Sequence, residues 1–278
     1  MLPKRDLPPQ KHPYRVQPKA KIDLSQIKTN DDSLYPVGKK HGKELFKEMA
    51  NEIGELQELL YAEGKHKLLV VMQAMDTGGK DGTIKDVFRE VTPQGLRVAS
   101  FKRPSENELA HDYLWRVHSQ VPANGEIVVF NRSHYEDVLI VRVHDLVPQK
   151  RWKRRYRHIV EFENMLVDEG TTIVKCFLHI SKAEQKRRLQ ERLDNPEKRW
   201  KFAPGDLEER SFWDDYQQAY ADMLSKTATD RAPWHIVPAD NKWYRDLVVA
   251  TILRDTLASL DLTLPDDPPN LDSIVIGD

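Results

Sequence analysis

Cysteine, net charge and long apolar runs are what this sequence of 278 residues has least of. Its one cysteine, Cys176, excludes a disulfide framework, and its place in the apolar run 172–178 indicates a small buried side chain. No apolar run reaches the roughly 18 residues of a membrane span, and the N-terminus lacks the apolar core of a secretion signal. We therefore expect a soluble, cytoplasmic protein with no membrane partner.

The charges almost cancel, with 43 basic and 44 acidic residues and a formal net charge of −1. This balance excludes a protein that binds polyanions over its whole surface, so any basic site has to be local. The chain is long enough for one large α/β domain or two small ones, each with a sizeable core.

What the sequence does contain is an alternation of strands and helices. Apolar runs predict buried strands at 68–72, 96–101, 126–130, 172–180 and 234–238. Helical spacing of apolar residues predicts helices between them, including one helix over 105–117. The rhythm indicates a three-layer α/β/α sandwich with a mainly parallel sheet, in which ligands bind beyond the carboxyl ends of the strands.

Proline and charge patterns divide the chain into three parts. Six prolines make 1–38 an extended N-terminal arm, and 263–278, rich in proline and aspartate, is a tail. The part between them, 39–262, is expected to be a single domain.

The first strand runs into a segment that nearly fits the phosphate-binding pattern G-x-x-x-x-G-K-[ST]. Ala74 replaces the first glycine and Asp81 replaces the hydroxyl residue, while a glycine and a lysine are in place. In such loops backbone N–H groups surround phosphate, and the helix N-terminus that follows favours an anion. We predict phosphate contacts for Gly78, Gly79, Lys80, Asp81, Gly82 and Thr83. The alternative is a tight glycine-rich turn with an incidental lysine.

Carboxylates follow the first and third predicted strands. Asp76 would repel phosphate in the loop unless a divalent cation lies between them. Strand 126–130 leads into Glu136 and Asp137, which can hold metal directly or through water, and into Arg132, which can grip a phosphate oxygen. We predict Asp76 and Asp137 as metal ligands, and Lys80, Asp137, Arg132 and Asp76 as catalytic residues. An Asx-turn at Asp76 and a polar surface loop at 131–137 are the alternatives.

Two basic clusters lie in the second half of the chain. The cations of 186–201, followed by Pro204 and Gly205, are typical of a mobile lid over an anionic substrate, which we place at about 182–212. The alternative is a solvated helix face with i,i+4 pairs. Residues 150–157 carry six cations. They fit nucleic-acid binding, a helix that buries Trp152 and Tyr156 and turns its cations to solvent, or a track for a long polyanion.

Three segments, 75–82, 130–137 and 194–201, together resemble the polyphosphate kinase 2 family over roughly residues 40–260. The resemblance implies a P-loop kinase fold similar to thymidylate kinase with a helical lid. It also implies that inorganic polyphosphate donates a phosphoryl group to a nucleotide with Mg²⁺, for which Mn²⁺ is a possible substitute.

The resemblance further implies roles for single residues. Glu136, where other members carry asparagine, resembles the class III subgroup, which takes nucleoside mono- and diphosphates, so the expected reaction runs from AMP to ADP to ATP. The lid is expected to bind polyphosphate through Arg187, Arg188, Lys198 and Arg199. The nucleotide is expected at Lys102, Arg103, Arg132 and Glu136.

Two other functions stay open, an ATP-dependent nucleoside monophosphate kinase of the same fold and a nucleic-acid-binding P-loop NTPase. No recognisable nucleic-acid module is present, so we expect no nucleic-acid partner. Aromatic-rich outer helices and the N-terminal arm favour a homo-oligomer.

Overall fold

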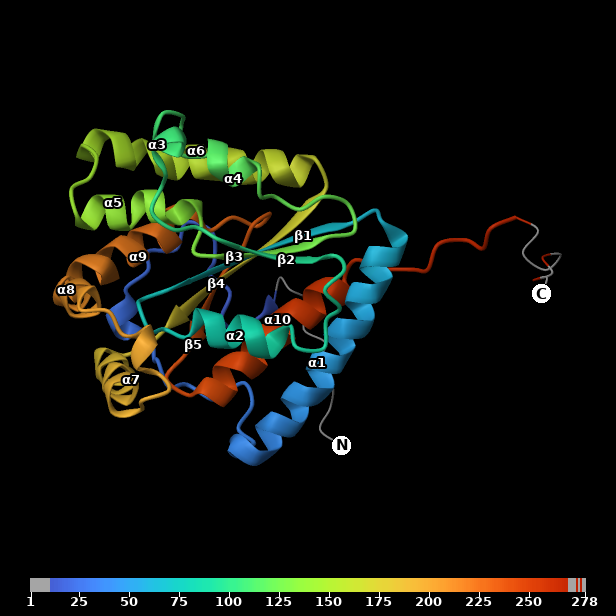
Figure 1. Ribbon diagram of the computed structural model, residues 1–278, viewed down its shortest axis with the longest axis horizontal. Coiled ribbons are helices and arrows are strands. Elements are labelled where there is room, and N and C mark those ends of the chain that lie inside the picture. The colour runs from blue at the N-terminus through green and yellow to red at the C-terminus, as the bar shows by residue number, and fades with distance from the viewer. Residues whose placement is uncertain (1–10, 270–273, 275, 277–278) are drawn as a thin grey trace.

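Five parallel strands form the centre of the computed structural model, which describes residues 11–269, 274 and 276 (Figure 1). The strands are β1 (Lys67–Ala74), β2 (Leu96–Ser100), β3 (Ile127–Asn131), β4 (Thr171–His179) and β5 (Trp234–Pro238). They lie in the order β2-β3-β1-β4-β5, and each pairs in parallel with its neighbours. The predicted parallel sheet is confirmed, and all five carboxyl ends lie at one edge.

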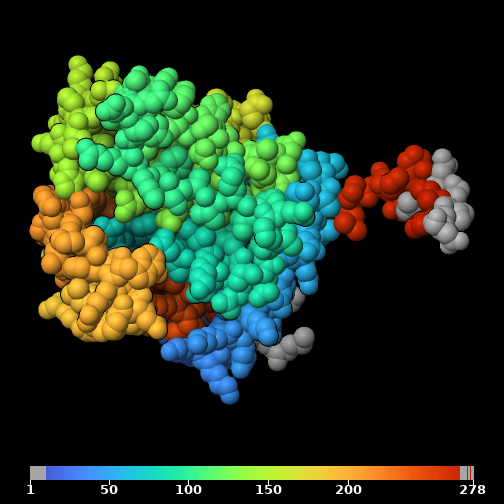
Figure 2. Space-filling model, viewed as in Figure 1, coloured from blue at the N-terminus to red at the C-terminus, as the bar shows by residue number. Residues whose placement is uncertain are grey.

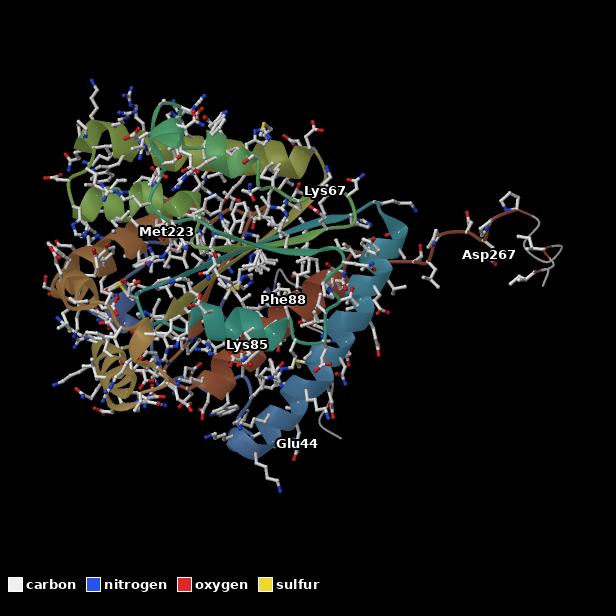
Figure 3. The ribbon with its side chains drawn as sticks, viewed as in Figure 1. Glu44, Lys67, Lys85, Phe88, Met223 and Asp267 are labelled. Atoms are coloured by element: carbon white, nitrogen blue, oxygen red, sulfur yellow. The ribbon has the colours of Figure 1, made fainter. Side chains whose placement is uncertain are left out.

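Helices cover both faces of this sheet, which confirms the predicted three-layer architecture. One layer holds α1 (Gly38–Glu63), α2 (Lys80–Val87) and α10 (Lys242–Ala258), and the other holds α5 (Ile140–Val143), α6 (Gln149–Asp168) and α9 (Trp213–Thr227). Phe88 and Met223, labelled in Figure 3, contribute to the buried core from opposite layers. The residues of β1 form a continuous apolar run because helices cover their side chains on both faces of the sheet.

The helix predicted over 105–117 is wrong in its extent. The structure has two single turns instead, α3 (Glu106–Leu109) and α4 (Trp115–His118). The expected capping box of Ser105 and Glu108 is present. The Asp112 carboxylate accepts a hydrogen bond from the Leu114 N–H at 2.9 Å, and such a local bond competes with a continuous helix.

The described part of the N-terminal arm packs on the outer edge of the sheet. Val16 N–H donates to the Trp234 carbonyl at 2.8 Å, and Ile236 N–H donates to the Tyr14 carbonyl at 2.9 Å. These bonds lay the arm antiparallel along β5. A short helix, η2 (Leu24–Gln26), follows. Residues 1–10 of the predicted arm and 270–273, 275, 277 and 278 of the predicted tail lie outside the described residues.

The predicted lid region contains α7 (Lys182–Asp194), η4 (Arg199–Lys201) and α8 (Gly205–Ser211). These elements lie beside the loop that joins β1 to α2, at the carboxyl edge of the sheet. Figure 2 shows a recess between the gold and orange helices of this region and the green segments opposite them. Within the described residues, no helix has both the length and the apolar character that a membrane crossing requires.

Candidate active site

The loop between β1 and α2 requires its glycines. A Cβ at Gly78 would lie 2.5 Å from the Ala74 Cβ and 2.7 Å from the Met75 carbonyl, whose oxygen accepts the Gly78 N–H at 2.9 Å. Gly79 has a φ of 104°, in the left-handed region that favours glycine. Thr77 also has a positive φ, 60°, which is costly for a β-branched residue. The chain is therefore folded tightly at the first turn of α2.

Lys80 begins α2 and reaches back across this loop. Its Nζ donates to the Ala74 carbonyl at 3.2 Å. Burial lowers the pKa of Lys80, and the carboxylates of Asp76 and Glu136 oppose this shift. The ammonium thus lies between the loop and two acidic side chains, where it can bind a phosphate oxygen.

Arg132 comes to the same place from the end of β3. Its guanidinium contacts the Asp76 carboxylate at 3.1 Å. Burial alone would lower the pKa of Arg132, but Glu136 and Asp76 raise it. Its φ of 61° is left-handed, and non-glycine residues held in this way often lie at functional sites.

Glu136 and Asp137, neighbours in the short helix η3 (His134–Val138), face different partners. Glu136 lines a cavity with Asp76 and Arg132, and burial raises its pKa while Arg132 and Lys80 lower it. The Asp137 carboxylate instead accepts a hydrogen bond from Arg155 of α6 at 2.9 Å. Burial raises the pKa of Asp137 to about 6. The structure therefore brings Glu136, rather than the predicted Asp137, to Lys80.

The cavity has a volume of about 250 Å³. Helix α9 contributes Tyr216 and Tyr220 to its wall, α7 contributes Gln185, and α8 contributes Glu209. The Tyr220 hydroxyl donates to the Ala74 carbonyl at 2.9 Å, which ties α9 to the end of β1. Sequence reasoning missed these four residues. Apolar residues of α9 recur at helical spacing, and that signal would have found the two tyrosines.

The remaining predicted loop residues have other partners or stay open. The Thr83 hydroxyl is buried and donates to the Asp246 carboxylate at 3.0 Å, so it points away from the cavity. The Asp81 carboxylate accepts from the Asn131 amide at 2.6 Å, which joins the loop to the end of β3. Gly82 is exposed on the first turn of α2.

Arg188 of α7, predicted to bind polyphosphate, is buried under the phosphate loop. Its guanidinium donates to the Gly78 carbonyl at 2.9 Å and the Thr77 carbonyl at 3.2 Å. It also donates to the carbonyls of Ala239 and Asp240 and to the Glu184 carboxylate. All five N–H groups thus have protein acceptors, and none is left for a substrate phosphate. The structure gives Arg188 the position of a residue that holds the loop.

The other predicted lid cations lie at the surface and contact protein groups. Arg187 pairs with Glu184 at 2.7 Å and with Glu191 at 3.4 Å, and Lys198 also pairs with Glu191. Arg199 donates to the Leu193 carbonyl at 2.8 Å. Their contact with polyphosphate stays a prediction. It would require these cations to replace their bonds to protein groups with bonds to phosphate.

Lys102 and Arg103 do not line the cavity of Arg132 and Glu136. They line a second cavity of about 430 Å³ beside the end of β2, together with Trp115 of α4. The Lys102 carbonyl accepts from Arg116 at 2.9 Å. The predicted nucleotide residues are therefore divided between two cavities.

A buried polar network supports the segment that carries Arg132 and Glu136. The Glu163 carboxylate of α6 pairs with Lys175 of β4 at 2.6 Å, and both side chains are almost fully buried. The same carboxylate accepts from the Tyr135 hydroxyl at 2.7 Å and contacts His134 at 3.2 Å. Because these contacts fix residues inside η3, they fix the direction of the neighbouring site residues.

Magnesium fits the oxygen donors at this cavity. Among the described residues, no group of three or more His, Cys, Asp or Glu side chains is arranged to hold a metal by itself. Mg²⁺ usually binds through one or two carboxylates together with waters and substrate phosphates. Asp76 and Glu136, which line the same cavity next to the phosphate loop, match that pattern.

Comparisons with known proteins identify the family. Residues 37–264 match the family described as polyphosphate kinase 2 (PPK2). The AMP/ADP-polyphosphate phosphotransferase of Meiothermus ruber is 58% identical over 263 residues, which cover 95% of this chain and 98% of the relative. The ADP-polyphosphate phosphotransferase of Rhodopseudomonas palustris is 45% identical over 268 residues, 92% of each chain.

A solved structure shows the same fold. The crystal structure of polyphosphate kinase 2 from Arthrobacter aurescens TC1 has a TM-score of 0.90 and 44% identity, covering 94% of this chain and 93% of that one. The resemblance noted in the sequence is confirmed, and the chain belongs to the polyphosphate kinase 2 family.

Proposed function

We propose that this protein transfers a phosphoryl group from inorganic polyphosphate to AMP and to ADP, forming ADP and ATP. One observation carries the proposal: the phosphate loop and the segment after β3 meet at one cavity, which Arg132, Asp76 and Glu136 line and beside which Lys80 lies close enough to interact with all three. The name of the Meiothermus ruber relative, which matches nearly the whole chain, supports this choice of donor and acceptors.

The chemistry suits these residues. A terminal oxygen of the acceptor phosphate attacks the last phosphorus of the donor, and the P–O–P bond behind it breaks, so the polyphosphate leaves one phosphate shorter. Such a step depends on positioning and charge neutralisation rather than on a protein nucleophile. We assign Lys80 and Arg132 to holding the phosphate oxygens in line.

Asp76 and Glu136 would hold Mg²⁺, which when bound would neutralise charge on the phosphate oxygens. Asp137 then holds Arg155 and the position of η3 rather than the ion. Glu136 therefore combines two proposed tasks, since it also lines the cavity that we assign to the acceptor phosphate. Lys102 and Arg103 would bind another part of the nucleotide from the second cavity.

The test offers purified protein AMP and Mg²⁺ with one of three donors: polyphosphate, GTP or none. ADP and ATP should form with polyphosphate only. Product with GTP alone would instead support an ATP-type nucleoside monophosphate kinase, and no product with any donor would contradict the proposal.

Matched variants connect the activity to the site. Lys80→Ala should lower kcat by about a hundredfold or more, because the ammonium acts on the transferred group. Lys85→Ala is the control, since Lys85 is exposed on the same helix and points away from the core (Figure 3). Glu136→Gln should raise the Mg²⁺ concentration needed for half-maximal rate more than Asp137→Asn does. The reverse order would restore Asp137 as the metal ligand.

Glu136→Asn tests the acceptor. The ratio of kcat/KM for AMP to that for ADP should change, and an unchanged ratio would remove Glu136 from acceptor selection. A cytoplasmic location and a homo-oligomer stay predictions, which cell fractionation and light scattering can test.

A further inference from the structure

The outer face of α6 is an exposed row of cations. Five side chains on this face are exposed: Lys150, Arg151, Lys153, Arg154 and Arg157. Figure 3 shows nitrogen-tipped side chains projecting from the end of the molecule formed by α6 and α3. In a chain with a net charge of −1, this is a local concentration of positive charge.

This charge is only slightly neutralised. The first turn of α6 contains no acidic residue. Among the described residues, the one carboxylate within ion-pair distance of these five cations is Glu161, at 3.4 Å from Arg157. The N-terminal end of a helix adds a partial positive charge to the same region. The face is therefore suited to a flexible anion.

The burial of the aromatic residues of α6 indicates which kind of anion its outer face suits. Trp152 and Tyr156 are each 5% exposed and belong to the core. The guanidinium of Arg142, in α5, lies over the Trp152 ring at 4.8 Å from the ring centroid. Single-stranded nucleic acid binds through aromatic platforms that stack on its bases, in addition to cations. Without an aromatic ring on the outer face, only the charges remain, and these suit a linear polyanion that has no bases.

The inner side of α6 reaches the active site. Arg155 of this helix contacts Asp137, the residue after the cavity-lining Glu136. Helix α6 and the segment η3 are neighbours in the same layer of the fold (Figure 1). A polyanion with one end in the cavity would have to pass over this layer to reach the outer face of α6, which requires a long chain.

We propose that the outer face of α6 is a second binding surface for the polyphosphate chain, which increases the affinity for long donors and leaves short donors unaffected. This inference rests on the proposed function, because it takes polyphosphate as the donor. Each contact replaces counterions on the polyanion, so the gain in affinity should decrease as salt is added.

The experiment compares the unmodified chain with the variant K150Q/R151Q/K153Q/R154Q/R157Q. For long polyphosphate the variant should show a KM raised about tenfold at low salt, with kcat unchanged. For donors of a few phosphates both parameters should be unchanged. The control is K39Q/K40Q/K43Q/K47Q on α1, four exposed lysines of the region marked by Glu44 in Figure 3, at the opposite end of the molecule. That variant should behave like the unmodified chain.

Several outcomes would overturn the inference. They are an unchanged KM for long donors, an equal change for short donors, and an equal change in the α1 variant. A fourth is single-stranded RNA that competes with long polyphosphate as strongly as unlabelled polyphosphate does, which would make the face a nucleic-acid surface.

Direct binding of labelled long polyphosphate, measured without nucleotide, separates the two proposals. If the unmodified chain transfers no phosphoryl group but binds long polyphosphate, and the α6 variant loses this binding, the result supports the binding surface and contradicts the proposed function. If the protein transfers phosphoryl groups but the unmodified chain and the α6 variant bind long polyphosphate equally, the proposed binding surface is contradicted and the proposed function is not.

Discussion

Helices α6 and α7 look alike in sequence and differ in how their charges are used. Each is rich in cations, and each turns one buried arginine toward the active site: Arg155 toward Asp137 and Arg188 toward the phosphate loop. On the outer face of α7 a glutamate lies near Arg187, whereas four of the five outer cations of α6 have no carboxylate within ion-pair distance among the described residues. The number of cations in a segment is therefore a poor guide to its charge, because the carboxylates one turn away decide how much of it remains.

The buried arginine of α7 should give the largest effect. Arg188→Met removes the donors to four carbonyls, two in the loop after β1 and two directly after β5, and leaves Glu184 without this partner. We expect the free energy of unfolding to fall by about 3–5 kcal/mol. Because displacement of the loop by about 1 Å is costly, kcat should also fall by about a hundredfold. Urea unfolding and steady-state kinetics measure both, and near-normal values would show that the loop does not depend on this arginine.

The inner face of α6 should give the next largest effect. Lys175→Met leaves the Glu163 carboxylate buried without its cation, which should lower the free energy of unfolding by about 3–5 kcal/mol while the phosphate loop stays in place. Urea unfolding measures this loss. The double variant E163Q/K175M should recover part of it, since no charge is then left buried. A double variant that is less stable than Lys175→Met would contradict this explanation.

Asp137 makes the α6 contact sensitive to pH. Its pKa in the folded chain is about 6, above its ordinary value of 3.8, so the folded protein holds a proton that the unfolded chain has released. Stability should therefore fall by up to about 3 kcal/mol as the pH rises from about 4 to about 6. Asp137→Asn should flatten this part of the curve, measured by urea unfolding at several pH values. An equally steep fall in the variant would assign the effect to another group.

The outer face of α7 should give the smallest effect. Arg187→Gln should change the free energy of unfolding by less than about 1 kcal/mol, because both of its ion pairs are at the surface. The KM for long polyphosphate should change less than in the α6 variant. A larger change than in that variant would show that these pairs open when the donor binds, as the sequence alone predicts.

The sequence predicted an element or a site well where a residue type has one main physical role, such as an apolar side chain in a buried strand or a glycine in a tight loop. The apolar run of β1, the glycines of the loop and Lys80 predicted the sheet and the phosphate loop, and they lie where expected. The strand ends also predicted that Arg132 and Asp76 belong to one site, and in the structure their side chains form an ion pair at 3.1 Å. Parallel strands bring their carboxyl ends to one edge whatever the connecting helices do.

The sequence was less informative about where each side chain points. Glu136 and Asp137 are adjacent acids, and nothing local shows which one faces the cavity, because the choice is made by Arg155 from a distant helix. Arg188 looks like its exposed neighbour in sequence, and only the three-dimensional packing of α7 on the loop buries it. The apolar spacing of α9 predicts a buried helix face, but it does not show that Tyr216 and Tyr220 of that face line the cavity, because this depends on how α9 packs against the end of β1.

The pairing of the arm with β5 has a consequence for shortening the chain. A version that begins at residue 37 would keep the whole family match, 37–264, and would look complete by sequence. It would also uncover the outer edge of β5, where the N–H of Ile236 and the carbonyl of Trp234 now bond to Tyr14 and Val16. An open strand edge can pair with another molecule, so the truncated protein should aggregate although every residue of its active site is present.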